Sequence, residues 1–257
     1  MRKNRLKEIL GNGGTVYGTF VSTPEIAVVE MIGWAGYDFV IIDMEHSPIN
    51  FGHLPSLFSA ANNVDLVPLV RVGTSAANPI LRVLDSGAMG VMVPHVRNRE
   101  EAMAIVRASR YPPQGARGVS GASRAAHYGH KNFIEHAQES NSEILTIALI
   151  EDKAGVDAID EIIDVSGLDV ICPGAGDLSA GLGLLGQPQH PSVQADVAKV
   201  VEAVTKHSKQ VLGCHAMGAE QRIRCQAQGA RFVIYSQDTR VILDAYRNAL
   251  VDLKNPN

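Results

Sequence analysis

The chain has 257 residues, of which 46% are hydrophobic and 19% are charged, and its formal net charge is −4. This length and composition suffice to bury a sizeable core, and the length is typical of one α/β barrel domain. The mildly acidic balance offers no basic field for nucleic acid or for an anionic membrane surface. We therefore expect a small-molecule partner and no nucleic acid.

Neither a leader nor a membrane span is evident along the chain. The first residues are basic, but no apolar h-region follows them, and no stretch reaches the roughly 18 unbroken apolar residues of a membrane span. We therefore expect a soluble, cytoplasmic protein. The three cysteines, Cys172, Cys214 and Cys225, form no CxxC motif, so we expect reduced thiols rather than disulfides or a cysteine zinc site.

Short β-branched runs alternate with amphipathic stretches along the whole chain. The predicted strands are residues 15–21, 38–43, 66–71, 91–95, 144–151, 169–174, 211–215 and 231–236. A helix from Pro24 to about Ala35 follows the first of them. Eight such units predict an α/β protein with a (β/α)8 TIM barrel, in a single domain over residues 1–257. The alternative, a doubly wound open sheet, needs a topological switch point that the sequence does not show.

Residues 111–129 break this rhythm between the fourth helix and the fifth strand. The segment is rich in Gly, Pro, Ser and Arg, and connections of more than about 15 residues are usually functional or disordered. It is either a substrate-binding loop or a plain surface excursion or subunit contact.

Chemistry-bearing side chains gather after the predicted strands. The active site of a parallel barrel lies at the carboxyl ends of its strands. The residues found there are Asp43, Glu45 and His46 after strand two, Arg71 at the end of strand three, Glu151 after strand five and Asp177 after strand six. We therefore expect these side chains to line one pocket.

Glu151 and Asp177 would face one another from adjacent strands. Hard divalent cations accept one or two carboxylates and leave the other positions to water and substrate oxygens, which a 2-oxo acid can supply. We therefore expect a metal site at this pair. Either residue alone would more simply be a solvated residue at the start of a helix.

The stretch CPGAGDLSAGLG, residues 172–183, resembles a dinucleotide fingerprint only weakly. No acidic ribose partner follows at the required distance, and we expect the next helix to begin after Asp177 rather than at the glycines. Gly174 and Gly176 would instead let backbone N–H groups approach a small carboxylate.

His46 follows Asp43 closely enough for the carboxylate to fix its tautomer, which makes His46 a candidate general base rather than a structural histidine. Arg71 would hold an anion or a developing oxyanion, or form an ion pair with Glu45, Asp43 or Asp85. Two further histidines, His95 and His215, end strands and are weaker candidates for the pocket wall.

The sequence resembles the HpcH/HpaI family of class II pyruvate aldolases. The matching motifs are FVIIDMEHSP, PLVRVG, LDSGAMGVMVPHV, RYPPQGARG, IED, GAGDLSAGLG and GQPQHP, in order between about residues 17 and 191. As a set they are highly specific.

The resemblance implies catalytic and binding roles for individual residues. His46 would be the base, paired with Asp43 and supported by Asp85, and Arg71 would contact the keto oxygen. Glu151 and Asp177 would hold the metal, and Ala175, Gly176 and Asp177 would form the substrate carboxylate turn.

The resemblance also implies a homohexamer, a trimer of dimers, in which a neighbouring subunit contributes to the pocket. The loop around Arg117 and Arg124 is the candidate for that contact.

Three departures from the family pattern limit what can be carried over. The turn at residues 174–179 reads GAGDLS where relatives often have GPADLS, and Leu149 stands where relatives often have Gln. The arginine-rich stretch after RGV is shortened and ends in Ala126 and His127, so the acceptor specificity does not carry over.

The expected activity is reversible, divalent-metal-dependent cleavage of a 4-hydroxy-2-oxo acid to pyruvate, or a close 2-oxo acid, and an aldehyde. Mg²⁺ or Mn²⁺ is the expected metal, with Co²⁺ or Zn²⁺ also compatible. Three alternatives stay open: a Schiff-base aldolase using Lys153, a citrate-lyase-like acyl-CoA lyase, and a non-catalytic barrel that binds small acids.

Overall fold

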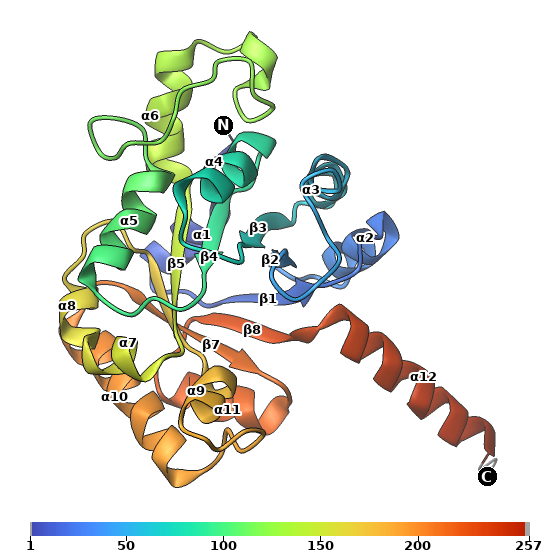
Figure 1. Cartoon of the computed structure of the whole chain (residues 1–257). Coiled ribbons are helices and arrows are strands. Elements are labelled where there is room, and N and C mark those ends of the chain that lie inside the picture. Colours follow the sequence, from blue (N-terminus) through green and yellow to red (C-terminus); the bar gives the residue numbers. More distant parts are fainter. Residues whose placement is uncertain (1, 255–257) are drawn as a thin grey trace.

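In the computed structural model, which describes residues 2–254, eight parallel strands close into one barrel in chain order (Figure 1). The strands are β1 (Val16–Val21), β2 (Phe39–Asp43), β3 (Val67–Arg71), β4 (Gly90–Val93), β5 (Leu145–Ile150), β6 (Val170–Pro173), β7 (Val211–Ala216) and β8 (Phe232–Gln237). The TIM barrel is thus confirmed and the open sheet was wrong. Residue 1 and residues 255–257 of the expected domain lie outside the described residues.

Most helices pack around the barrel and connect its strands, while α1 precedes β1 and α12 follows β8. They are α1 (Arg5–Gly11), α2 (Ile26–Trp34), α3 (Leu54–Asn63), α4 (Ala77–Ser86), α5 (Arg99–Ser109), α6 (Phe133–Glu143), α7 (Lys153–Asp157), α8 (Ile159–Ile163), α9 (Ala175–Gly181), α10 (Pro191–His207), α11 (Ala219–Ala227) and α12 (Asp238–Lys254). No helix in the described range is long and apolar enough to cross a membrane.

The side chains of each strand alternate between two apolar layers, as the pleat requires. One layer fills the barrel, where the rings of Phe39 and Phe232 stack with centroids 4.3 Å apart. Gly18 of β1 makes room for this stack, because a Cβ there would lie 2.2 Å from the Phe39 ring. The other layer packs the outer strand faces against the helices.

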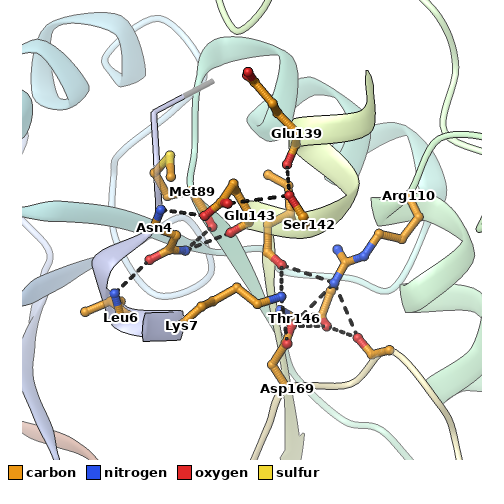
Figure 2. Close-up of polar contacts among 12 residues, drawn as sticks. Asn4, Leu6, Lys7, Met89, Arg110, Glu139, Ser142, Glu143, Thr146 and Asp169 are labelled. Atoms are coloured by element: carbon orange, nitrogen blue, oxygen red, sulfur yellow. Dashed lines mark hydrogen bonds and ion pairs between the residues drawn. The ribbon is translucent and has the colours of Figure 1, made fainter. Parts of the chain in front are cut away.

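The amino-terminal end of the barrel is closed by α1. Asn4 caps this helix through the N–H of Leu6, and its amide donates to the carbonyl oxygens of Met89 and Glu143 (Figure 2). Lys7 reaches Asp169 at 3.0 Å beside the start of β6. With this end plugged, the carboxyl end is the open mouth of the barrel.

The segment 111–129 is a largely exposed connection that is anchored by the buried Arg117. It contains a short 3₁₀ helix (His127–Gly129) and leads into α6. Arg117 is 3% exposed, bonds Asp85 at 2.7 Å and Ser140 at 3.1 Å, and lies over the ring of Tyr111. The guanidinium of Arg117 is therefore engaged inside its own chain rather than offered to a neighbouring subunit.

Candidate active site at the carboxyl end of the barrel

The inward positions at the ends of the strands bring most of the expected residues to one mouth. Asp43 and Arg71 are register partners on β2 and β3, and Glu151 directly follows β5. Two residues with less sequence support complete the wall: Phe20 on β1 and His215 on β7, whose rings meet edge to face at 5.3 Å.

Asp43 clamps Arg71 with two hydrogen bonds. Nε and Nη2 of Arg71 donate to the two carboxylate oxygens of Asp43 at 2.9 and 2.7 Å. Burial alone would raise the pKa of Asp43, which is 3% exposed, but the bonds from Arg71 outweigh this and hold that pKa below its ordinary value. The guanidinium also lies 4.5 Å over the Phe20 ring, so it is fixed in direction, and Nη1 keeps protons that can reach a ligand.

His46 is not oriented by Asp43 as expected. The carboxylate of Asp43 instead accepts the backbone N–H groups of Glu45 and His46, at 3.0 and 3.3 Å. The His46 imidazole is largely exposed, and its Nε2 lies 3.7 Å from Glu45, which also reaches Arg71 at 3.4 Å. Asp43 therefore shapes the loop that carries the histidine, and the neighbouring carboxylate is that of Glu45.

Asp85 is at the wrong end of the barrel to support His46 or Arg71 within the chain. It lies in the last turn of α4, which runs back from the mouth toward the start of β4. Its carboxylate is bonded by Arg117, while Arg71 pairs with Asp43 and Glu45 as expected. Within the chain, Asp85 therefore holds the segment that follows α5, and its predicted support of His46 stays a prediction.

Glu151 is a buried carboxylate on the opposite wall from Asp43. It is 5% exposed, and its Oε1 accepts the backbone N–H of His95 at 3.0 Å. Burial raises the pKa of Glu151 to about 7, and the negative charges of Asp177 and Glu45 add to the rise. The anionic form of Glu151 is therefore less favourable than that of an exposed glutamate, and a proton or a cation would stabilise this group.

His95 follows β4 and has a left-handed backbone, with φ of 54°, which is uncommon for a residue with a side chain. This conformation directs its N–H toward Glu151, and its Nδ1 lies 3.1 Å from Asp152. Desolvation would lower the pKa of His95, but the charges of Glu151 and Asp152 outweigh it and raise that pKa. His95 thus lines the mouth beside the buried carboxylate.

The turn between β6 and α9 lies directly against Glu151. A Cβ at Gly174 would lie 2.5 Å from Glu151 Oε2, so the absence of a side chain there lets the carboxylate take its position. The helix begins at Ala175, not after Asp177 as expected, since Leu178 N–H already donates to the Gly174 carbonyl. The N–H groups of Ala175, Gly176 and Asp177 are therefore first-turn donors that precede the helical bonds.

His215 and Leu149 set the polarity of the remaining wall and floor. The His215 side chain is accessible from the mouth. The barrel walls around it partly desolvate the imidazole, and this desolvation and the charge of Arg71 lower its pKa. Leu149, which replaces the family's Gln, packs in the apolar layer inside the barrel. The alternation of β1 and β7 is the sequence signal that could have placed Phe20 and His215 with more weight.

Lys153 does not have the environment of a Schiff-base lysine. It begins α7, its side chain is 45% exposed, and it pairs with Asp157 at 2.7 Å and Asp196 at 3.1 Å. These partners raise its pKa, whereas a Schiff-base amine must lose its proton easily. The geometry therefore disfavours the lysine alternative.

A match to the HpcH/HpaI aldolase/citrate lyase family covers residues 16–245. The chain belongs to this family. It is 36% identical over 258 residues to a hydroxypyruvate/pyruvate aldolase of Paraburkholderia phytofirmans strain PsJN, with 98% of each chain covered. The family assignment and the expectation of an aldolase-type lyase are thereby confirmed.

Two solved structures superpose closely on the chain. An HpcH/HpaI aldolase/citrate lyase family protein from Burkholderia cenocepacia J2315 has a TM-score of 0.94 and 32% identity, covering 98% of this chain and all of that one. A citrate synthase has a TM-score of 0.88 and 38% identity, covering 97% of each chain. Both aldol-type and citrate-type chemistry thus occur among similar proteins.

Asp43→Asn should lower the free energy of unfolding by about 2–4 kcal/mol at pH 7, because it removes one partner of a buried charged pair. The pKa of Asp43 is depressed in the fold, so its stabilisation is present above the ordinary aspartate pKa and is lost as the pH falls through the folded value. Urea denaturation at pH 7 and pH 3 should show the difference from wild type shrinking in acid. Asp160→Asn, at an exposed position of α8, is the control.

Proposed function

We propose that the chain catalyses reversible, divalent-metal-dependent aldol cleavage of a 4-hydroxy-2-oxo acid to pyruvate, or a close 2-oxo acid, and an aldehyde. One observation carries the proposal. The guanidinium of Arg71, held by two hydrogen bonds, and the buried carboxyl group of Glu151, whose pKa is raised, lie at the same barrel mouth. Cleavage of this kind needs a stabilised enolate, and charge placed where the enolate develops is the strongest means to that end.

The residues of the mouth fit a divalent cation. The family is known for divalent-metal dependence. The Glu151 carboxylate is desolvated and is repelled by the negative charge of Asp177. Its Oε1 accepts the N–H of His95, and its Oε2 is left for a cation. Between residues 2 and 254, no group of three or more His, Cys, Asp or Glu residues could hold a metal by itself. A pair of carboxylates that leaves positions for water and substrate suits Mg²⁺ or Mn²⁺, and Co²⁺ or Zn²⁺ could substitute.

When bound at Glu151 and Asp177, the cation would act as a Lewis acid toward the 2-oxo acid. Arg71, aimed by Asp43, would donate Nη1–H bonds to the keto oxygen and stabilise the charge that grows there on enolisation. The first-turn N–H groups of Ala175, Gly176 and Asp177 would orient the substrate carboxylate. These contacts would place the substrate carbon next to the keto group, which loses or gains the proton, in the open mouth.

His46 would move the protons. Its imidazole is exposed at the mouth beside Glu45, and it would take the hydroxyl proton of the substrate in the cleavage direction and return a proton to the enolate carbon. The Glu45 carboxylate lies 3.7 Å from Nε2 of this imidazole. Because the imidazole is largely exposed at the mouth, it would be accessible to both positions of the reacting carbon chain.

Exchange of the pyruvate methyl protons in D2O, followed by NMR, tests the enolate chemistry without knowledge of the aldehyde. Exchange should require Mg²⁺ or Mn²⁺ and should fall on the order of 10²- to 10³-fold in Arg71→Ala, as for loss of an oxyanion donor. It should also be lost in His46→Ala. Arg107→Ala, which removes an exposed guanidinium at the far end of α5, should exchange like wild type.

Exchange that survives a chelator would contradict the metal-dependent reaction. No exchange with any divalent ion would remove pyruvate as the donor.

Gly174→Ala should weaken Mn²⁺ binding on the order of tenfold or more, because the new Cβ would displace the side chain of Glu151. Loss of the groups that position a metal ligand has an effect of this size. Gly181→Ala lies in the same helix with open space at its Cβ and should bind like wild type. Titration of Mn²⁺ followed by electron paramagnetic resonance measures both. Equal affinities in the two variants would mean that Glu151 is not a ligand.

Metal binding should release a proton near neutral pH. Glu151 has a pKa of about 7, so part of the population is protonated at pH 6.5 and must ionise to bind a cation. Affinity should therefore rise with pH through 7 and level off above it. Calorimetry in two buffers of different ionisation enthalpy at pH 6.5 should report net proton release, and release should vanish at pH 9. Binding heats independent of buffer at pH 6.5 would contradict this linkage.

A second candidate activity is citrate-type chemistry on a thioester. The 38% identity to a citrate synthase structure favours it, because attack of an enolate on a carbonyl is common to both reactions. Assays with acetyl-CoA and oxaloacetate, followed by thiol release, separate it from pyruvate-aldehyde cleavage. A non-catalytic acid-binding barrel would show saturable binding and neither reaction.

We also propose a homo-oligomer, specifically a hexamer built from dimers, in the cytoplasm, where the three free thiols stay reduced. α12 extends away from the barrel (Figure 1). Leu243, Tyr246, Leu250 and Leu253 recur on it at intervals of three and four, are 49–78% exposed, and thus form one apolar stripe. In the proposed homo-oligomer, a second copy of the chain would bury this stripe.

Leu250→Glu should therefore dissociate the assembly, because it puts a charge in the apolar stripe. Asn248→Glu adds the same charge at a polar, exposed position of α12 and should leave the mass unchanged. Light scattering coupled to size exclusion gives the molar mass of each. A wild-type monomer would contradict the proposal.

A further inference from the structure

His215 faces the barrel mouth from the end of β7. It is the one exposed residue of this strand, whose other five residues are buried. Alternate residues of a strand face the same side. Val211 lies in the apolar layer inside the barrel, whereas Cys214 lies in the layer against the helices. The His215 side chain therefore faces inward, and because it stands at the open end of the barrel, solvent and ligands can reach it.

The His215 imidazole lies in the same group of side chains as Arg71. It meets the Phe20 ring edge to face at 5.3 Å, and the Arg71 guanidinium lies 4.5 Å over that ring. Alternate strands of a (β/α)8 barrel contribute the side chains of one layer, and these three residues come from β1, β3 and β7. Glu151 follows β5, the remaining strand of this alternate set. His215 thus stands among the groups that line the mouth.

The steps proposed for the 2-oxo acid leave His215 without a role. Arg71 and the cation act on the keto oxygen, the first-turn N–H groups of α9 orient the carboxylate, and His46 moves the proton. On another part of the wall, the His95 imidazole is held by Asp152, with Nδ1 and Oδ2 3.1 Å apart. His215 is therefore positioned for the second substrate, the aldehyde.

The environment of His215 favours an uncharged polar ligand group. Desolvation and the charge of Arg71 lower the pKa of its imidazole, and a backbone interaction with Ser236 opposes this effect only in part. A neutral imidazole has one N–H donor and one acceptor nitrogen, so it suits a hydroxyl group, which also donates and accepts. A second carboxylate would be repelled by the bound 2-oxo acid and by Glu45. The Phe20 ring offers an apolar surface to a short carbon chain.

We propose that His215 determines the acceptor specificity by hydrogen-bonding the hydroxyl group of a 2-hydroxyaldehyde. This inference rests on the proposed aldol reaction and names the class of its second substrate. In the addition direction, the enolate carbon bonds to the aldehyde carbon, and the aldehyde oxygen takes from His46 the proton that left the pyruvate methyl group. His215 would hold the hydroxyl group on the neighbouring carbon of the aldehyde.

Addition of pyruvate to glycolaldehyde and to propionaldehyde, followed by NMR with Mg²⁺ present, tests the proposal. The two aldehydes have nearly the same shape, but propionaldehyde has a methyl group in place of the hydroxyl group. Wild type should prefer glycolaldehyde in kcat/KM on the order of tenfold, because the methyl group leaves the imidazole unpaired. His215→Leu should lose most of this preference through a lower kcat/KM for glycolaldehyde. His215→Gln, which can still donate and accept, should keep part of it.

Two controls separate the aldehyde from pyruvate. Exchange of the pyruvate methyl protons needs no aldehyde and should continue at the wild-type rate in His215→Leu. His207→Leu removes an exposed histidine in the last turn of α10, at the other end of the barrel. It should keep both the exchange rate and the preference for glycolaldehyde.

Equal kcat/KM values for the two aldehydes, in wild type that exchanges the pyruvate protons, would overturn the role of His215 and leave the aldol reaction standing. Loss of exchange in His215→Leu and His215→Gln, both folded by circular dichroism, would also overturn it, because the imidazole would then act on pyruvate. Absence of exchange in wild type would remove the aldol reaction and this role with it. The wild-type comparison decides the outcome even where a variant folds poorly.

Discussion

The two-pronged bond between Asp43 and Arg71 joins the second and third strands at the mouth of the barrel. The same carboxylate accepts two backbone N–H groups from the loop after β2. A lone carboxylate at 3% exposure would be strongly disfavoured by desolvation, and a guanidinium beside Phe20 would be disfavoured as well. Together they satisfy one another, so the pair sets the position of Arg71 and the shape of the loop that carries His46.

Glu151 on the opposite wall has no guanidinium partner of this kind. Asp43 is stabilised as an anion by Arg71, whereas Glu151 accepts one backbone bond from His95, whose Nδ1 lies 3.8 Å away, and faces the negative charges of Asp177 and Glu45. The two carboxyl groups thus have opposite shifts in pKa within one mouth. Groups whose environments separate their pKa values in this way are typical of functional sites. Asp43 thus holds a protein cation, whereas Glu151 has the environment that the proposed external cation requires.

Much of this architecture could be predicted from the sequence, because strand ends in a parallel barrel share one edge. Each expected strand lies within two residues of its observed bounds, and Asp43, Arg71 and Glu151 lie together. Asp85 lies apart from these residues within the chain, because a helix of ten residues carries its last turn to the other end of the barrel, and its predicted role stays a prediction. α1 and α6 begin at asparagine caps, Asn4 and Asn132, a short signal that hydrophobic periodicity does not weigh.

The charge of the mouth also bears on the order in which ligands bind. Asp43, Glu45, Glu151 and Asp177 contribute four carboxyl groups, and Asp43 and Glu45 are already in contact with Arg71. An anionic 2-oxo acid entering this mouth would meet repulsion from Glu151 and Asp177 unless a proton or a cation neutralises them. A proton on Glu151 removes one negative charge, whereas a divalent ion would cancel the charges of both Glu151 and Asp177 and would offer open positions to oxygen. In the proposed reaction, the cation would therefore bind before the substrate and would displace the proton of Glu151.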